Sequence, residues 1–566
     1  MKLTGAQILI RSLIDEGVTD VFGYPGGQVI NIYDAIYEYR SEINHVLTAH
    51  EQGAAHAADG YSRATGKVGV CIATSGPGAT NLVTGIATAM LDSIPMVAIT
   101  GNVPCSLIGK DSFQEIDITG ITLPITKHNY FVNRIEDLAD TVREAFSIAK
   151  SGRPGPVLID IPKDVQIATY EYESRGTSEK IPLPKGKDSD ILRAIELVNE
   201  AKRPYIYIGG GAAGLGLGRE IVEFADKIDG CIGCTFMGLS AIPDGYSDRF
   251  LGMQGMHGHY ASSVSQNEAD LIIGIGVRFS DRATGNVKKY AKGSKIIQLD
   301  PDFSEINKNV KVDCGIVGDV EHSFREIAKA AAEKKNPEWM ARIKELREDE
   351  EKFEREIAEK STASLTPRRV FDVINAKKPE NTVIVTDVGQ HQMWTAQYVK
   401  FDNTRRFVSS GGLGTMGFGL GAAIGARVAT GDTTVLITGD GSFGMNLNEL
   451  ATAVSHNIPV VIVLMNNGVL GMVRQWQTLF FGERYSNTVL TDRKTDFVRL
   501  AEAFGAVGMR AENFEQFDEA FETAVKLNRP VVIDTLIDKD EFVLPMLPPG
   551  GSVDEIITKV EKRGAK

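Results

Sequence analysis

Two stretches decide the fold of this chain: Val435-Leu-Ile-Thr-Gly-Asp-Gly-Ser442 and Val460-Val-Ile-Val-Leu-Met-Asn-Asn467. Each begins as a short apolar run rich in β-branched residues and ends in Gly, Asp or Asn, which is typical of a buried strand followed by a turn. Such runs recur along all 566 residues and alternate with longer amphipathic stretches. The alternation predicts an α/β protein whose mostly parallel sheets are covered by helices on both faces. Other predicted strands are Val68–Ala73, Met96–Thr100, Val157–Ile161, Tyr205–Ile208, Leu271–Ile275 and Val383–Thr386.

Two polar stretches divide the chain into segments of domain size. Ala168–Asp188 is polar and contains two prolines, and Glu333–Lys360 has charged residues at 18 of its 28 positions. In the second stretch Trp339, Ile343 and Leu346 recur at helical spacing, continued by Phe353 and Ile357, which predicts a surface helix with one packed stripe. The predicted organisation is an N-terminal domain (1–167), a middle domain (189–332), a charged helical linker (333–364), a C-terminal domain (365–540) and a tail (541–566).

The first and third segments repeat each other. Thr74-Ser-Gly-Pro-Gly78 and Thr438-Gly-Asp-Gly-Ser442 each follow a predicted strand. An Ala-Thr-Ala triplet begins 13 residues after each threonine, and an Ile-Pro pair begins 20 residues after it. Identical spacing over a strand–loop–helix–strand unit predicts two homologous domains on either side of a different middle one.

The composition excludes several classes of protein. A net charge of −13 makes a poor binder of nucleic acid, because phosphate contacts dominate that affinity. The apolar N-terminal stretch is interrupted by Arg11 and Asp15, which argues against a signal peptide, and the longest apolar run, Val460–Met465, is far shorter than a membrane span. Five cysteines, including the isolated pair Cys231 and Cys234, do not indicate a disulfide framework or a zinc site. We therefore expect a cytoplasmic protein that binds neither nucleic acid nor membrane.

The strongest chemical signal is Gly439-Asp440-Gly441 followed, after 24 residues, by Asn466-Asn467. Taken alone, such a motif is usually a turn in which Ser442 caps a helix. Here a carboxylate and an amide oxygen end neighbouring strands, and these are hard ligands of the kind that Mg²⁺ takes together with a phosphate group. The glycines allow backbone N–H groups to approach a diphosphate. The spacing predicts a metal-diphosphate site.

The pattern resembles that of thiamine-diphosphate enzymes, in which it marks the domain that binds the pyrophosphate. The resemblance implies that Mg²⁺ is bound by Asp440, Asn467 and the carbonyl of Val469. The stretch HEQGAAHAADGYSRATGK, from His50, is similar to the family segment that carries the cofactor-activating glutamate, here Glu51. By position alone Glu51 would be an ordinary acidic residue at a helix start.

Nine further motifs are spread over the whole chain. They are VFGYPGG (Val21–Gly27), TSGPGATN (Thr74–Asn81), SFQE (Ser112–Glu115), GRPGPVLIDIPKD (Gly152–Asp164), GMHGH (Gly255–His259), RFSDRATGN (Arg278–Asn286), GGLGTMGFGL (Gly411–Leu420), GMVRQWQ (Gly471–Gln477) and LPPGG (Leu547–Gly551). With these motifs the chain resembles the catalytic subunit of acetohydroxyacid synthase, also called acetolactate synthase. That family condenses pyruvate, with loss of CO₂, with a second pyruvate or with 2-ketobutyrate, as the first common step of branched-chain amino-acid synthesis.

The resemblance assigns residues around thiamine diphosphate and its substrates. Gly27 would lie near the reacting centre, Phe113, Gln114 and Lys163 would line the substrate entry, and Arg282 would hold the carboxylate of the second ketoacid. Met472 and Trp476 would shape the pocket of that ketoacid, and Met416 would support the bent cofactor. Cofactor contacts are expected from Glu51, Pro25, Gly26, Thr74, Gly78, Asn81, Gln114, Gln390, His391, Gly414, Met416, Gly439, Asp440, Gly441, Ser442 and Met472.

The middle segment contains Gly209-x-Gly211-x-x-Gly214 after a predicted strand. The acidic residue that NAD sites need about twenty positions later is missing. The resemblance implies a Rossmann-like domain that binds FAD in a structural role. The implied FAD contacts are Arg153, Gly209, Gly210, Gly211, Gly255, Met256, His257, Gly276, Arg278, Asp281, Arg282, Asp300 and Asp319.

Two positions, Asn102 and Ser280, depart from the family pattern, which leaves flavin affinity and fine substrate preference open. The resemblance further implies a homodimer or homotetramer with active sites at the interface, and a small regulatory subunit as a further partner. Three alternatives stay open at this point. They are a catabolic synthase without FAD, another thiamine-diphosphate carboligase or decarboxylase, and a flavin- or nucleotide-binding regulatory protein without catalysis.

Overall fold

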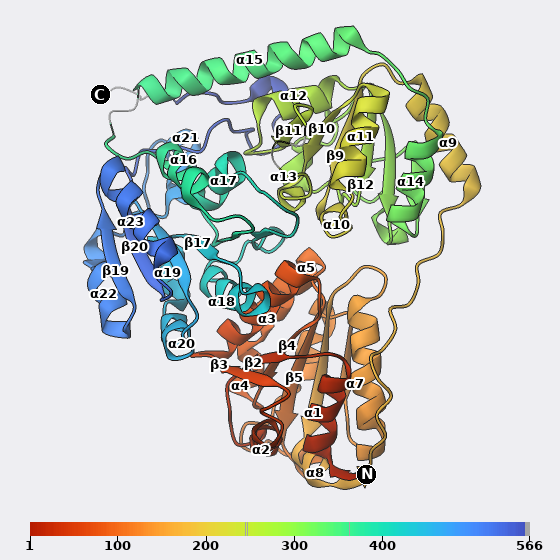
Figure 1. The fold of residues 1–566 in the computed structure, drawn as a ribbon, viewed down its shortest axis with the longest axis vertical. Coiled ribbons are helices and arrows are strands. Elements are labelled where there is room, and N and C mark those ends of the chain that lie inside the picture. Colours follow the sequence, from red (N-terminus) through yellow and green to blue (C-terminus); the bar gives the residue numbers. More distant parts are fainter. Residues whose placement is uncertain (244, 246, 361–362, 561–566) are drawn as a thin grey trace.

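Three six-stranded parallel sheets, each covered by helices, form the body of the molecule in the computed structural model (Figure 1). The structure describes residues 1–243, 245, 247–360 and 363–560. The sheets confirm the predicted α/β class with two related outer domains and a Rossmann-like middle one. A short antiparallel pair, β1 (Lys2–Thr4) with β8 (Thr169–Glu171), ties the start of the chain to the end of the N-terminal domain.

The N-terminal sheet has the strand order β3-β2-β4-β5-β7-β6, with all strands parallel. Its central strands β4, β5 and β7 are buried along their whole length, as expected of a parallel sheet with helices on both faces. The strands are β2 (Asp20–Gly23), β3 (Asn44–Leu47), β4 (Gly69–Ala73), β5 (Met96–Asn102), β6 (His128–Phe131) and β7 (Pro156–Pro162). The helices are α1 (Gly5–Asp15), α2 (Ile30–Glu38), α3 (Glu51–Thr65), α4 (Pro77–Asn81), α5 (Val83–Asp92), α6 (Ile118–Thr122), α7 (Ile135–Lys150) and α8 (Lys163–Ile167).

The C-terminal sheet has the order β16-β15-β17-β18-β20-β19, which is the order of the N-terminal sheet strand for strand. The predicted homology of the two outer domains is thereby confirmed at the level of topology. The strands are β15 (Val383–Thr386), β16 (Phe407–Val408), β17 (Thr434–Gly439), β18 (Val460–Asn466), β19 (Val507–Ala511) and β20 (Val531–Leu536). The helices are α16 (Pro367–Lys377), α17 (Gln390–Tyr398), α18 (Gly419–Thr430), α19 (Asp440–Asn446), α20 (Glu449–Ser455), α21 (Gly471–Phe480), α22 (Phe497–Phe504) and α23 (Phe514–Lys526).

The middle sheet has a different order, β11-β10-β9-β12-β13-β14. Counted along the chain this is 3-2-1-4-5-6, the order of dinucleotide-binding sheets. The strands are β9 (Pro204–Ile208), β10 (Cys231–Cys234), β11 (Phe250–Met253), β12 (Leu271–Ile275), β13 (Lys295–Asp300) and β14 (Cys314–Val317). The helices are α9 (Asp188–Glu200), α10 (Gly210–Ala213), α11 (Gly218–Ile228), α12 (Tyr260–Glu268), α13 (Asp281–Thr284) and α14 (Val320–Ala330).

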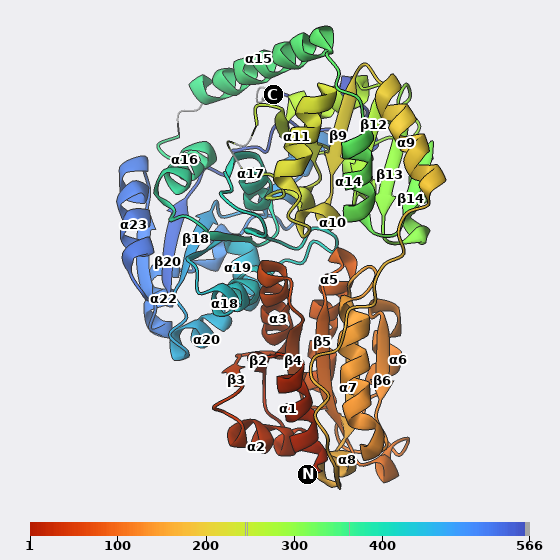
Figure 2. The same cartoon turned by 45° about the vertical axis from the view of Figure 1, so that its right-hand side comes forward.

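The outer domains meet along α3 and α18, which lie side by side at the centre of the molecule (Figure 2). A Cβ atom at Gly60 would lie 2.1 Å from the carbonyl oxygen of Ala422, and one at Gly425 would lie 1.8 Å from that of Ala57. Gly60 corresponds to Gly425 and Ala57 to Ala422, because the two helices align on the glycines that end them, Gly66 and Gly431. The contact is therefore symmetric: Gly60 of α3 faces Ala422 of α18, and Gly425 of α18 faces Ala57 of α3.

The segments that lead into the two helices follow the same symmetry. The backbone N–H of Ala49, before α3, donates to Thr452 Oγ1 of α20 at 3.0 Å. The hydroxyl of Thr415, before α18, is 2.8 Å from that of Thr88 in α5. Each outer domain thus uses the same helix of its fold to hold the segment that precedes the central helix of the other.

The charged stretch forms the long helix α15 (Pro337–Lys360), which crosses the top of the molecule in Figure 1. Trp339, Ile343 and Leu346 are buried, and the ring of Phe353 contacts that of Tyr260 in α12. Ile357 is exposed, so the predicted packed stripe does not reach the last turn of the helix. None of the described helices is long and apolar enough to cross a membrane.

The predicted strands are present, and the structure lengthens several of them. β5 continues to Asn102 and β18 to Asn466, so both strands include polar residues that the sequence places in turns. The physical reason is that the ladder continues: Asn102 pairs with Pro162, and Asn466 pairs with Leu536. Cys231 and Cys234 are buried in β10, as the sequence predicts.

Candidate active site

Glu51 is the first residue of α3, directly after β3 and its connecting loop. Asn81 Nδ2, at the end of α4, donates a hydrogen bond of 2.9 Å to Glu51 Oε2. A Cβ atom at Gly78 would lie 3.2 Å from Glu51 Oε1, so glycine leaves this oxygen accessible. Burial and the nearby Glu51 carboxylate raise the pKa of the Tyr33 hydroxyl. The structure therefore brings the predicted residues Glu51, Gly78 and Asn81 together.

The loop after β2 lies against the same group. The backbone N–H of Gln28 donates to Thr74 Oγ1 at 3.3 Å, and a Cβ atom at Gly26 would lie 2.5 Å from Thr74 Cβ. Lys163 Nζ, at the start of α8, donates to the carbonyl oxygen of Gly27 at 3.0 Å. Pro25 precedes these glycines in the same loop. The predicted cofactor and entry residues of the N-terminal domain form one cluster at the carboxyl ends of its strands.

Phe113 and Gln114 belong to the segment between β5 and α6. Phe113 is 83% exposed, the most exposed large apolar side chain of the described residues. Gln114 has a φ of 62° and packs against Gly76, where a Cβ atom would lie 2.9 Å from Gln114 Cβ. Gln114 thus reaches the loop after β4, whereas the phenyl ring of Phe113 is left uncovered.

The C-terminal domain carries the predicted metal ligands at the ends of neighbouring strands. Asp440 follows β17 directly and is buried, and Asn467 follows β18 directly. The backbone N–H of Val469 donates to Asn467 Oδ1 at 3.2 Å, which folds the chain back at this point. Burial raises the pKa of the Asp440 carboxyl to about 6. A bound cation would favour the ionised form that burial opposes, so a carboxylate, an amide oxygen and a carbonyl oxygen here suit Mg²⁺.

Further predicted cofactor residues surround Asp440. His391 is buried, burial lowers the pKa of its imidazole to about 3, and its Nε2 has no hydrogen-bond partner. A Cβ atom at Gly439 would lie 2.9 Å from His391 Nδ1, and one at Gly441 would lie 3.7 Å from Met416 Cε. The neutral ring can present an unused N–H to an anion such as a diphosphate.

Other side chains of this group are already engaged within the protein. Gln390 Oε1 accepts from Asn467 Nδ2 at 3.2 Å, and Ser442 Oγ donates to the carbonyl oxygen of Val388 at 2.7 Å. A Cβ atom at Gly414, whose φ is 69°, meets open space. Gln390 therefore holds Asn467, the predicted metal ligand, and the hydroxyl proton of Ser442 is already donated within the protein.

Helix α21 brings Met472 and Trp476 to the edge of this domain. The guanidinium of Arg282, from the middle domain, lies 5.8 Å from the centre of the Trp476 ring, and its side chain is largely exposed. Trp476 Nε1 is buried without a hydrogen-bond partner. The structure brings together Arg282 and Trp476, the residues predicted to bind and shape the site of the second ketoacid.

The glycine-rich loop of the middle domain joins the end of β9 to α10. A Cβ atom at Gly209 would lie 1.9 Å from the carbonyl oxygen of Gly276, and one at Gly211 would lie 2.9 Å from Gly276 Cα. Two backbone segments therefore meet at the carboxyl ends of β9 and β12, where the strand order reverses. Dinucleotides bind at this point of such sheets.

The other predicted FAD residues lie on the loop after β11, on α13 and at the end of β13. Met256 N donates to the carbonyl oxygen of Arg282 at 2.8 Å, and a Cβ atom at Gly255 would lie 2.7 Å from the same oxygen. His257 Nδ1 is buried without a partner, and burial lowers the pKa of this imidazole to about 4. Burial raises the pKa of Asp300 to about 6.

Three further predicted FAD residues are engaged by other protein groups or exposed. Arg153 Nη1 donates to Glu305 Oε1 at 2.7 Å, and Asp319 accepts from the N–H of His322 at 3.0 Å as the N-cap of α14. Asp281 is exposed. Because capping accounts for the Asp319 carboxylate, its part in FAD binding stays a prediction.

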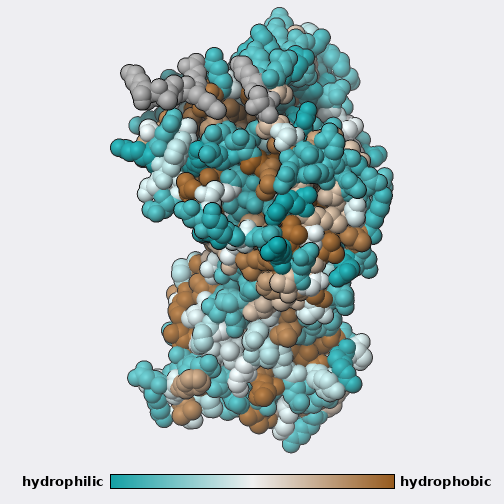
Figure 3. All heavy atoms as spheres, turned by 90° about the vertical axis from the view of Figure 1, so that its left-hand side faces the viewer, coloured by the Kyte–Doolittle hydropathy of each residue, from teal (hydrophilic) through white to brown (hydrophobic). Residues whose placement is uncertain are grey.

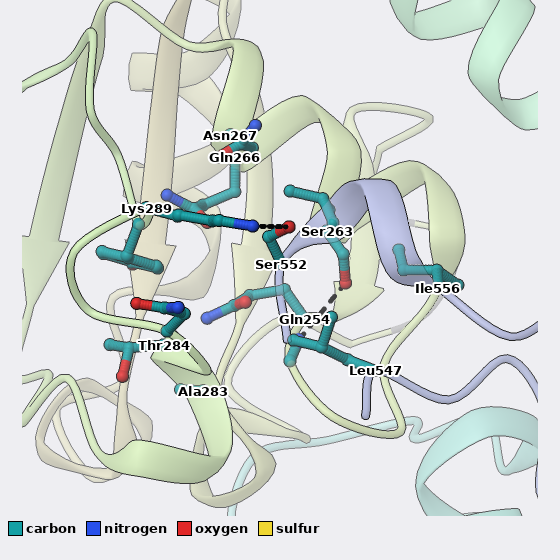
Figure 4. Close-up of a pocket in the computed structure, with 14 residues that line it drawn as sticks. Gln254, Ser263, Gln266, Asn267, Ala283, Thr284, Lys289, Leu547, Ser552 and Ile556 are labelled. Carbon is teal, nitrogen blue, oxygen red and sulfur yellow. Dashed lines mark hydrogen bonds between the residues drawn. The ribbon is translucent and has the colours of Figure 1, made fainter. Parts of the chain in front are cut away.

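A small cavity of about 30 Å³ lies beside the loop after β11 (Figure 4). It is lined by Gln254 and Ser263 from the middle domain and by Leu547 and Ser552 from the tail. In Figure 4 Lys289 points toward Ser552, and the Nζ–Oγ distance is 3.4 Å. A space of this size holds one or two water molecules, so it is not a flavin site in itself.

The cofactor residues of the outer domains form two separate groups. Within residues 1–243, 245, 247–360 and 363–560, no hydrogen bond, ion pair or ring contact connects Glu51 and Asn81 with Asp440, Asn467 and His391. Each group lies at the strand ends of its own domain. We refer to these two groups, one in each outer domain, as half-sites.

Three family models match consecutive parts of the chain. They are the N-terminal TPP binding domain (residues 3–121), the central domain (191–327) and the C-terminal TPP binding domain (387–535) of thiamine pyrophosphate enzymes. A probable acetolactate synthase large subunit of Methanocaldococcus jannaschii is 45% identical, over 99% of this chain and 96% of that protein. The isozyme 3 and isozyme 2 large subunits of Escherichia coli K12 are 41% and 43% identical, over 99% of this chain and 99% and 100% of theirs.

The chain belongs to the acetolactate synthase large-subunit family. The resemblance that the motifs indicate is thereby confirmed, as is the assignment to the thiamine-pyrophosphate-dependent enzymes. The roles proposed for single residues rest on the half-site geometry described above.

Two residues that sequence reasoning missed join the half-sites to the rest of the protein. Glu449, in α20, is buried, and its Oε2 accepts from the N–H of Ala49 at 3.2 Å, two residues before Glu51. Asp92, at the end of α5, binds the segment that leads to Met416. The internal repeat offered a signal for Asp92, because it follows Thr74 by 18 residues as His456 follows Thr438.

Proposed function

We propose that this chain is an acetolactate synthase that joins pyruvate, with loss of CO₂, to a second 2-ketoacid. A second pyruvate gives 2-acetolactate, and 2-ketobutyrate gives 2-aceto-2-hydroxybutyrate, in branched-chain amino-acid synthesis. The observation that carries the proposal is the full-length similarity to acetolactate synthase large subunits in a chain that keeps Glu51, Asp440 and Asn467 at the strand ends of two homologous domains.

Thiamine diphosphate, when bound, supplies a carbon that adds to the ketoacid carbonyl and accepts the electrons released with CO₂. Asp440, Asn467 and the carbonyl oxygen of Val469 would hold Mg²⁺ on its diphosphate, with His391 Nε2 as a further donor. Glu51 Oε1 would hold a proton at a ring nitrogen of the cofactor's pyrimidine. Asn81 supports this role because it holds the other oxygen of Glu51 in place.

The substrate residues follow from their positions. Lys163, held on the Gly27 carbonyl oxygen, and the exposed Phe113 beside Gln114 would line the entry. Arg282 would bind the carboxylate of the second ketoacid, for which a guanidinium fork is suited. Met472 and the Trp476 ring beside Arg282 would shape its pocket.

FAD would bind in the middle domain in a structural role. The close approach of Gly209 and Gly211 to Gly276 and the unpartnered His257 Nδ1 support a dinucleotide there. Of the implied FAD contacts, Arg278 lies in the loop after β12, and Asp300 is the last residue of β13, at the same edge of the sheet.

A second copy of the chain would complete each active site, because the Glu51 and Asp440 half-sites do not meet within one chain. Exposed apolar side chains near α19 and α21 support such a partner: Met445, Val473, Phe480, Phe481 and Val489. Figure 3 shows apolar patches on both sides of the narrow part of the molecule. The relatives are named large subunits, which supports a small regulatory subunit as a further partner.

The test is an assay of purified protein with pyruvate, thiamine diphosphate and Mg²⁺, with 2-ketobutyrate added in a second series and the flavin spectrum recorded on the same sample. We expect acetolactate, a mixed product in the second series, and bound FAD. Release of CO₂ without acetolactate would indicate a decarboxylase instead. A colourless, fully active protein would indicate a synthase that does not need FAD.

A further inference from the structure

Asp92 lies where all three domains meet. Its carboxylate is fully buried at the end of α5 in the N-terminal domain. Oδ1 accepts from the backbone N–H of Gly412 at 2.8 Å, and Oδ2 accepts from that of Gly411 at 2.9 Å. These glycines begin the segment that ends at Met416, the predicted support of the bent cofactor. One carboxylate of the N-terminal domain therefore fixes the start of a cofactor-binding segment of the C-terminal domain.

The middle domain reaches the same carboxylate through Arg278. Arg278 Nη1 donates to the carbonyl oxygen of Leu91 at 2.6 Å, and its Nη2 is 3.9 Å from Asp92 Oδ1. Arg278 is only partly buried, so its guanidinium can also face a bound anion. The residue predicted to contact FAD is thus a direct neighbour of the residue that holds Gly411 and Gly412.

A second contact joins the same regions independently. A Cβ atom at Gly411 would lie 2.3 Å from Met237 Sδ, and one at Gly210 would lie 3.0 Å from Met237 Cβ. Phe236, the neighbour of Met237, stacks edge-on against Phe407 of β16 at 5.1 Å. Met237 therefore lies between the glycine-rich loop and Gly411, the first residue of the Gly411–Met416 segment.

The equivalent position in the other outer domain lacks this connection. His456 corresponds to Asp92, and its Nε2 accepts from the backbone N–H of Leu47 at 3.0 Å, as Asp92 accepts from Gly412. In the described part of the chain, no hydrogen bond or ion pair joins His456 to the middle domain. The fold that the two outer domains share therefore does not by itself require the contact between Asp92 and Arg278.

We propose that Asp92 is a positioning residue through which FAD binding in the middle domain tightens thiamine diphosphate binding. The inference rests on the proposed function for the identity of both cofactors. Binding of FAD orders Arg278 and the glycine-rich loop, Asp92 and Met237 then hold Gly411–Met416, and thiamine diphosphate meets a segment already in place. Because coupling between two ligands is reciprocal, thiamine diphosphate must tighten FAD binding by the same factor.

The test compares the Kd of thiamine diphosphate, measured by calorimetry at fixed Mg²⁺, for flavin-free protein and for protein saturated with FAD. Couplings of this kind are typically about 5- to 150-fold, and we expect a ratio in that range for the unaltered chain. Asp92→Asn should bring the ratio close to one. It also removes the ion pair between Asp92 Oδ2 and Arg63 Nη2 at 3.0 Å, but Arg63 keeps its second partner, Asp59, so we expect the fold to be retained. His456→Gln, at the equivalent position, is the matched control and should keep the full ratio.

Arg278→Gln provides a second variant, because a partly exposed side chain is replaced and folding is not at risk. At saturating FAD it should also lose the coupling. An unchanged ratio in both Asp92→Asn and Arg278→Gln overturns the proposal. Equal Kd values with and without FAD in the unaltered chain overturn the coupling but leave the proposed reaction intact, whereas absence of any FAD binding overturns the flavin site together with the coupling.

Discussion

The two outer domains are the same architecture with different chemistry. Their sheets share one strand order. In both sheets an asparagine Nδ2 donates a hydrogen bond to a buried aspartate on the neighbouring strand of the sheet, Asn102 to Asp160 at 2.6 Å and Asn466 to Asp534 at 2.8 Å. They differ in the loop that follows the third strand of the repeat, where Gly76 stands in place of Asp440. The two outer domains therefore share one scaffold and differ in the residues at the ends of their strands.

The largest expected effect concerns the N-terminal half-site. Glu51→Gln keeps the size of the side chain and its bond to Asn81 but removes the ionisable proton carrier. We expect kcat for acetolactate formation to fall by about 10²- to 10⁴-fold, the usual contribution of acid–base catalysis. Thiamine diphosphate affinity should change little. Glu42→Gln, in an exposed pair with Arg11, is the control and should retain full activity.

The C-terminal half-site should respond to metal instead. Asp440→Asn removes a charged ligand of the predicted Mg²⁺ site. The Mg²⁺ concentration for half-maximal activity should therefore rise by more than the roughly 10- to 100-fold that is typical when a residue that only orients a metal ligand is replaced. Asp432→Asn, just before the same strand, should leave the metal titration unchanged. Equal metal requirements in the Asp440 variant and the unaltered chain would remove Asp440 from the metal site.

Because the contact between α3 and α18 is symmetric, we expect equivalent substitutions in the two helices to lower the free energy of unfolding equally. Gly60→Ala and Gly425→Ala each force a methyl group against a backbone carbonyl of the facing helix. We expect each to lower the free energy of unfolding by about 1–3 kcal/mol, as measured by denaturant titration. Gly293→Ala, whose Cβ meets open space, should be close to neutral. A large difference between Gly60→Ala and Gly425→Ala would break the equivalence of the two domains.

The smallest expected effect is on the pH dependence of stability and comes from Asp160, one of the two buried aspartates. Burial raises the pKa of the Asp160 carboxyl to about 7, although the hydrogen bonds from Thr100 and Asn102 oppose this. The equivalent Asp534 lies beside a guanidinium, and Arg510 Nη2 donates to Asp534 Oδ2 at 3.2 Å. Since an unfolded aspartate ionises near pH 4, the folded protein binds the extra proton between about pH 4 and 7, and Asp160 lowers stability as pH rises through that window. Asp160→Asn should flatten this fall in melting temperature between pH 5 and 7. An unchanged pH profile would contradict the assignment.

Much of the fold could be predicted from the sequence, because β4, β17 and β18 are apolar runs, β17 and β18 end in Gly and Asn, and the units that follow β4 and β17 have the same spacing. The half-site residues Asp440 and Asn467 could be predicted for the same reason, since they follow neighbouring strands directly. The repeat marks Asp92 as the counterpart of His456, but the role of Asp92 could not be predicted, because it depends on a contact with Gly411 across more than 300 residues of sequence. Such contacts are set by the packing of domains, which no local pattern encodes.

The central claim is that the Glu51 half-site of one chain works with the Asp440 half-site of its partner. The most direct measurement is the activity of Glu51→Gln and Asp440→Asn chains produced together. In a mixed dimer one active site carries both changes and the other carries neither. We predict recovery of roughly a quarter of the unaltered activity from a random mixture of the two chains. Activity that stays at the level of the two separate variants would contradict the claim and place both half-sites in the same chain.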